Sequence, residues 1–252
     1  MRKHLKIGLV VPNATDKVPA EGPMMYPDVT FIPRGVGVRA LTPEGYDAAW
    51  DAILPAAKEL AKLDIDAIMV IGTSLTFYRG YEAHQKLLEQ LRVETGLPVS
   101  TMSEAVVEGL RSVGAKRVAV ATAYSDLVND RLADFLRRSG FEVLAMRGFG
   151  LTGFGDAAKQ SEQDIINLSG KVIDEAKAAD ALLISCGGLM TLGCAVPIEQ
   201  RHGIPVVTST QSAFWKALRL TGESGHVPDR GRMLAQSPPT AATATGGPAI
   251  RV

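Results

Sequence analysis

The sequence has few cysteines, no excess of charge of either sign and no long apolar run. Its two cysteines among 252 residues are too few for a disulfide framework, and their spacing matches no CxxC or zinc motif. Lys plus Arg and Asp plus Glu each number 27, so no basic surplus favours nucleic acid or an anionic membrane. The apolar runs are shorter than a membrane span, and residues 7–12 are too few for a signal peptide. We therefore expect a cytoplasmic protein that binds neither membranes nor nucleic acid.

Apolar segments of strand length alternate along the chain with segments of helical periodicity. The expected strands are residues 7–11, 67–71, 118–121, 142–146, 181–185 and 205–207. The expected helices are residues 46–63, 81–95, 103–112, 129–139 and 162–178. Because the strand segments are almost continuously apolar, they indicate strands covered on both faces, as in parallel sheets flanked by helices. The pattern predicts an α/β fold.

An internal repeat indicates that the chain consists of two related halves. Residues 66–75 (DAIMVIGTSL) match residues 180–189 (DALLISCGGL) position for position. Two further matches keep the same order along the chain: residues 96–103 with 203–210, and residues 6–11 with 117–122. We infer two pseudo-symmetric domains, each a mostly parallel β-sheet flanked by helices, with the active site in the cleft between them.

The repeat and the composition also suggest boundaries. The first half is expected to comprise residues 1–114 plus 209–235, and the second half residues 115–208. Residues 236–252 are a low-complexity segment with nothing to bury, so we expect a disordered tail there.

The ends of the repeated strands carry the main chemical signal. Gly72-Thr73-Ser74 follows one strand and Cys186-Gly187-Gly188 follows the other. Small residues let a substrate approach the backbone, and N–H groups and hydroxyls there can bind an oxyanion. The alternative is a pair of tight turns, which favour the same residues. Cys186 precedes a Gly-Gly turn into an expected helix and is either a reactive thiol or an inert core residue. Cys194 is expected to pack in the core.

Three other features of the sequence bear on function. The segment at residues 148–153 fits GxGxxG, but no acidic residue follows at the spacing that holds a ribose, so a loop at the rim of the cleft is expected. The four histidines are scattered and expected at the surface, which gives little support to a metal cluster or a His-activated nucleophile. Tyr124 follows a strand, where its phenol either donates to a substrate oxygen or caps the sheet.

Several stretches resemble the arylmalonate decarboxylase family, within the aspartate/glutamate racemase superfamily. They are residues 42–47, 72–80, 95–98, 117–124, 185–189 and 214–215, so the resemblance covers most of the chain. Racemases and isomerases of this superfamily carry a cysteine at both equivalent strand ends. Here the first position is Gly72 and only Cys186 remains, as in the decarboxylases.

The resemblance implies a cofactor-independent, metal-free decarboxylation of 2-aryl or 2-alkenyl malonates. An enediolate would be held in a dioxyanion hole and protonated on one face by Cys186. The resemblance assigns the hole to Thr73, Ser74, Tyr124 and the backbone of Cys186 and Gly187. It assigns the substrate pocket to Pro12, Asn13, Val38, Leu41, Tyr46, Gly72, Leu75, Phe154 and Ala157. Asn13, Phe154 and Ala157 depart from the family pattern, which puts the size of the accepted substrate in doubt.

Two other functions remain open at this point. One is a maleate isomerase or an amino-acid or hydantoin racemase that works with one thiol. The other is a non-catalytic carboxylate-binding protein that uses the same hydroxyls and amides. In each case the expected partner is a small carboxylate or dicarboxylate, and a monomer is expected because both halves of the cleft lie in one chain.

Overall fold

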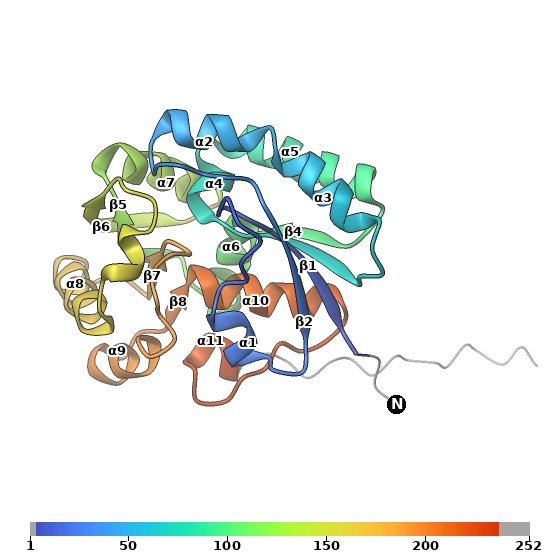
Figure 1. The fold of residues 1–252 in the computed structure, drawn as a ribbon. Coiled ribbons are helices and arrows are strands. Elements are labelled where there is room, and N and C mark those ends of the chain that lie inside the picture. The colour runs from blue at the N-terminus through green and yellow to red at the C-terminus, as the bar shows by residue number, and fades with distance from the viewer. Residues whose placement is uncertain (1–3, 237–252) are drawn as a thin grey trace, which may run out of the picture.

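The computed structural model describes residues 4–236, which form two parallel four-stranded sheets with helices around them (Figure 1). The first sheet has the order β2-β1-β3-β4, and its strands are β1 (Lys6–Val11), β2 (Thr30–Gly35), β3 (Ala67–Val70) and β4 (Val99–Thr101). The second has the order β6-β5-β7-β8, and its strands are β5 (Arg117–Tyr124), β6 (Glu142–Leu151), β7 (Ala181–Ser185) and β8 (Val206–Thr208). All strand pairs are parallel, and the two orders are the same when β1 is aligned with β5. The expected duplicated α/β fold is confirmed.

The helices connect successive strands and cover the sheets. They are α1 (Glu21–Met25), α2 (Pro43–Trp50), α3 (Ile53–Ala61), α4 (Thr73–Phe77), α5 (Tyr81–Thr95), α6 (Met102–Ser112), α7 (Asp126–Arg138), the 3₁₀ helix η1 (Asp156–Lys159), α8 (Glu162–Glu175), α9 (Ala195–His202), α10 (Ser209–Leu220) and α11 (Arg232–Ala235). Helix α10 packs against α6 and contacts strands of both sheets, at the centre of the molecule (Figure 1). These two helices therefore join the halves, and the predicted tail lies outside the described residues except for Gln236.

The repeat extends to matching hydrogen bonds at the start of the central strands. In the first half, Asp66 accepts from the backbone N–H of Lys6 at 3.0 Å, and its own N–H donates to the Lys6 carbonyl at 2.8 Å. In the second half, Asp180 accepts from the N–H of Arg117 at 2.9 Å and donates to the Arg117 carbonyl at 2.9 Å. One aspartate in each half thus sets the register of two neighbouring strands, β1 with β3 and β5 with β7. In each half, the carboxyl ends of these two parallel strands therefore lie at the same edge of the sheet.

Several local expectations differ from the structure. Strands β2 and β4 were not among the expected strands, and the helix expected over residues 46–63 is divided into α2 and α3. Strand β2 is a half-buried edge strand that contains Pro33, and edges are where a sheet tolerates proline. Strand β6 continues to Leu151, so only the segment after it forms a loop. The residues after Cys186 form turns, and a helix begins only at Ala195. Cys186 therefore does not precede a helix directly.

Within residues 4–236, no helix is long and apolar enough to cross a membrane.

Candidate active site

A cavity of about 390 Å³ lies where the loops that follow β1, β3 and β7 meet. The structure brings thirteen of the fourteen expected site residues to its wall: Pro12, Asn13, Val38, Leu41, Tyr46, Gly72, Thr73, Ser74, Leu75, Phe154, Ala157, Cys186 and Gly187. Tyr124 is the exception; it lies behind the wall and is fully buried. Both halves contribute to the lining, which is mostly apolar. The cavity is therefore shared between the halves.

The Cys186 thiol sits on strained backbone in this wall. Its φ is +148°, a region that residues with a side chain rarely adopt, and the residue is only 7% exposed. Burial raises the pKa of the thiol above its ordinary value, although the N–H groups of Gly188 and Leu189 and the Tyr124 hydroxyl oppose this effect. The Gly188 N–H donates to Sγ at 3.4 Å. At neutral pH the group is a protonated thiol.

Gly72 occupies the equivalent position in the first half. Its φ is +112°, so a residue with positive φ follows both repeated strands. A Cβ at this position would lie 3.2 Å from Cβ of Leu75. The cavity wall thus carries a thiol at Cys186, whereas the equivalent position in the first half, Gly72, has no side chain.

Four buried hydroxyls form a chain that begins at Thr73 in the cavity wall. Thr73 Oγ1 donates to Ser209 Oγ at 2.8 Å, and Ser209 Oγ donates to Ser185 Oγ at 3.5 Å. Ser185 Oγ in turn lies 3.5 Å from the Tyr124 hydroxyl. Burial raises the pKa of Tyr124 far above its ordinary value, and Ser74 and Cys186 act on this phenol from close by. The chain of hydroxyls links two of the expected dioxyanion donors through Ser209 and Ser185, which the sequence reasoning did not include.

A buried carboxylate also lines the cavity and was not expected. Glu21 in α1 is 1% exposed and accepts hydrogen bonds from the backbone N–H and the hydroxyl of Thr191. Burial raises its pKa above the ordinary value. Because Thr191 belongs to the segment after Cys186, this contact ties α1 of the first half to the cysteine-bearing loop of the second.

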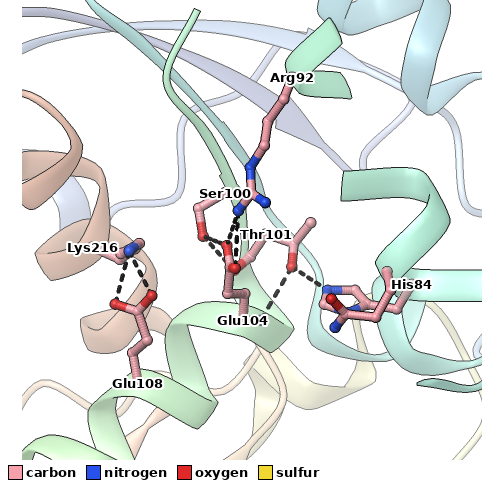
Figure 2. A network of polar contacts seen from close by, with 8 residues as sticks. His84, Arg92, Ser100, Thr101, Glu104, Glu108 and Lys216 are labelled. Atoms are coloured by element: carbon pink, nitrogen blue, oxygen red, sulfur yellow. Dashed lines mark hydrogen bonds and ion pairs between the residues drawn. The ribbon is translucent and has the colours of Figure 1, made fainter. Parts of the chain in front are cut away.

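A second polar network joins α5, β4 and α6 in the first half (Figure 2). His84 is buried, which corrects the expectation of a surface histidine, and its Nε2 lies 2.7 Å from Thr101 Oγ1. Thr101 accepts from the N–H of Glu104 and so caps α6. One residue into that helix, the Ser103 hydroxyl donates to the Thr73 carbonyl at 2.9 Å. Burial lowers the pKa of His84 to about 4, so the ring is neutral and structural.

The other cysteine lies apart from the cavity lining. Cys194 is buried at the start of α9, as the packing interpretation requires, and burial raises its pKa to about 12. Among residues 4–236, no three His, Cys, Asp or Glu side chains are grouped so that they could hold a metal ion.

Two parallel α/β halves that share a cavity are the architecture expected for the aspartate/glutamate racemase superfamily. The sequence model of arylmalonate decarboxylase matches residues 7–234. The arylmalonate decarboxylase of Bordetella bronchiseptica is 42% identical over 232 residues, which are 92% of this chain and 97% of that protein. The chain belongs to the arylmalonate decarboxylase family, a family of carboxy-lyases.

Solved structures agree with this assignment. A liganded double mutant of arylmalonate decarboxylase superposes with a TM-score of 0.90 at 40% identity, covering 92% of this chain and all of that one. The maleate isomerase of Pseudomonas putida S16 superposes with a TM-score of 0.84 at 23% identity over 91% of this chain and 98% of that one. The maleate isomerase of Geobacillus stearothermophilus is 24% identical over 249 residues, 93% of this chain and 99% of that protein. The isomerases share the fold.

Proposed function

We propose that this protein decarboxylates 2-aryl or 2-alkenyl malonates without a cofactor and delivers the replacement proton from Cys186. The observation that carries the proposal is a neutral, buried thiol on strained backbone in the wall of a largely apolar cavity. A thiol whose pKa is raised holds its proton at neutral pH, as a proton donor must. Inert core cysteines have no need of a strained backbone, and Cys194 in the same chain has none.

The polar and apolar parts of the wall suit the two carboxylates of a malonate differently. In the proposal, the retained carboxylate binds the hydroxyls of Thr73 and Ser74 and the N–H of Gly187, which line the cavity, and the Tyr124 hydroxyl behind them completes the dioxyanion hole. Each such donor is typically worth about 2.7 to 4 kcal/mol in a transition state. The leaving carboxylate is placed against apolar side chains such as Val38 and Leu41, which are buried in the cavity wall. An apolar site disfavours the anion and favours neutral carbon dioxide.

The proposed reaction balances without any further reactant except water. The bond between Cα and the leaving carboxylate breaks, and its electron pair passes into the retained carboxylate as an enediolate. Carbon dioxide leaves, Cα takes the proton of the Cys186 thiol, and the resulting thiolate regains a proton from solvent. Because only one face of the enediolate meets a thiol, a substrate with two different α-substituents would give one enantiomer. Gly72, on the pseudo-symmetric side, offers no proton.

Carbon dioxide release tests the proposal. Purified protein without added metal or nucleotide should release carbon dioxide from 2-phenylmalonate and from 2-methyl-2-phenylmalonate, and Cys186→Ala should abolish it. Cys194→Ala is the matched control, because it removes a buried thiol outside the cavity lining.

Other results point to the other two functions. Exchange of an α-proton in heavy water without carbon dioxide release would indicate a racemase or isomerase. Tight carboxylate binding without turnover, unaffected by Cys186→Ala, would indicate a binding protein.

A further inference from the structure

The buried hydroxyl of Ser209 contacts both sides of the proposed site. Ser209 is the first residue of α10 and is 1% exposed. Its Oγ accepts from Thr73 Oγ1 at 2.8 Å, on the first half, and from the backbone N–H of Cys186 at 3.4 Å, on the second half. One hydroxyl therefore touches a proposed dioxyanion donor and the main chain of the proposed proton donor.

The repeat shows that this hydroxyl is not needed to build the strand-to-helix junction. The equivalent junction in the first half runs from β4 into α6, where Met102 holds the position of Ser209. Both junctions are capped in the same way, by Thr101 and Thr208, whose hydroxyls accept an N–H three residues later. A residue without a hydroxyl thus forms the same local structure.

Met102 and Ser209, the two equivalent residues, contact different groups at the two strand ends. Met102 packs against Gly187, where an added Cβ would lie 3.1 Å from its sulfur. Gly187 in turn is the repeat partner of Thr73, which contacts Ser209. The two equivalent contacts therefore differ: Thr73 and Ser209 form a pair of hydroxyls, whereas Gly187 and Met102 pair a glycine with a thioether. The hydroxyl pair is specific to the side that carries the threonine.

We propose that Ser209 is a positioning residue that orients the Thr73 hydroxyl toward the substrate carboxylate. The inference rests on the proposed function and deepens it. Thr73 gives its proton to Ser209, and Ser209 gives its own to Ser185 over a long 3.5 Å contact. When a carboxylate approaches Thr73, the Ser209 proton turns from this weak contact to Thr73 Oγ1. The Thr73 proton is then free to donate to the carboxylate.

A double-mutant cycle tests this role. Ser209→Ala should lower kcat on 2-phenylmalonate about 10-fold, the value of one neutral hydrogen bond in the transition state, with a smaller change in KM. In a Thr73→Val background the same substitution should lower kcat less than about 2-fold, because the group that Ser209 orients is gone. Ser169→Ala is the control: it removes a hydroxyl that is equally buried, lies in α8 and has no hydrogen-bond partner among residues 4–236. It should leave kcat unchanged.

Ser209→Cys keeps the bulk of the side chain but is a poor hydrogen-bond partner, and should also lower kcat. Ser209→Cys replaces Ser209→Ala in this measurement if the alanine variant does not fold. Wild-type kcat in a folded Ser209 variant, or an equal loss in both backgrounds, would overturn the role of Ser209 while leaving the decarboxylase proposal intact.

A binding measurement separates the two proposals. If the wild type releases no carbon dioxide, the proposed function fails, and calorimetric binding of phenylacetate makes the same comparison without turnover. If Ser209 orients Thr73, Ser209→Ala should bind phenylacetate more weakly than the wild type does. In the Thr73→Val background, adding Ser209→Ala should leave the affinity unchanged. Wild-type affinity in the single variant Ser209→Ala contradicts the orientation of Thr73.

Discussion

Replacing Cys186 by glycine should stabilise the protein relative to replacing it by alanine. Both variants lose the thiol, so their difference isolates the backbone conformation at this position. The φ of +148° is costly for alanine and free for glycine. At ordinary positions the order is the reverse, because glycine has more conformational freedom to lose on folding.

The expected size follows from two opposing contributions. A residue with a side chain in a sparsely populated region of φ/ψ space costs about 1 to 3 kcal/mol. The ordinary penalty of glycine relative to alanine is about 0.5 to 1 kcal/mol. The difference favours Cys186→Gly over Cys186→Ala by about 1 kcal/mol in free energy of unfolding, which for a chain of this length raises Tm by about 2 to 4 °C.

Thermal and urea unfolding of the two variants, followed by circular dichroism, measure this difference. Ala121→Gly in β5 is the matched control, because Ala121 is also buried but has no positive φ; it should lower the free energy of unfolding. If Cys186→Gly is less stable than Cys186→Ala by the amount seen at the control, the backbone at Cys186 is not strained. Cys186 would then share an ordinary backbone conformation with inert core cysteines such as Cys194.

Three further predictions concern donors and titrating groups. Tyr124→Phe should lower kcat about 100- to 1000-fold, the usual loss for one oxyanion donor. Tm should change little, because the buried ring is kept and the contact of the hydroxyl to Ser185 is long, at 3.5 Å; a loss of kcat below about 3-fold would contradict the role of Tyr124. The alkaline fall of kcat/KM should lie above the ordinary thiol pKa of about 8.5, since burial raises the pKa of Cys186 and the reactive thiol is lost only as pH rises through that value; a fall below pH 8 would contradict the assignment. The pKa of His84 is about 4 in the fold against 6.5 for the ordinary group, so its neutral form favours folding fully above pH 6.5 and this contribution is lost as pH falls toward 4. Urea unfolding should show that the free energy of unfolding of the wild type falls by on the order of 3 kcal/mol over this range, and that His84→Gln lacks this loss. Equal losses in the two proteins would refute the prediction.

The duplicated fold was predictable because the repeat preserves the residues that build each strand end. Asp66 and Asp180 start the matched segments and make equivalent hydrogen bonds, and the small residues that follow each strand allow the positive φ of Gly72 and Cys186. Thirteen residues expected at the site line one cavity because the carboxyl ends of parallel strands share a sheet edge.

Other features depend on tertiary contacts that leave little trace in local sequence. Strand β2 has a proline and an edge position in place of a continuous apolar run, so its periodicity is weak. His84 is buried because Thr101 and Phe135 come to it from other elements. Ser209 lies in the repeated segment but differs from Met102, its partner in the alignment. A comparison of the unequal positions within the repeat was the signal that could have revealed it.

Decarboxylation of 2-methyl-2-phenylmalonate in heavy water measures whether one thiol protonates one face of an enediolate. The wild-type enzyme should give one enantiomer of the monocarboxylic acid with a single deuterium at Cα, and Cys186→Ala should give no enantioenriched product. Formation of the same enantiomer at the wild-type rate by Cys186→Ala would show that Cys186 is not the proton donor.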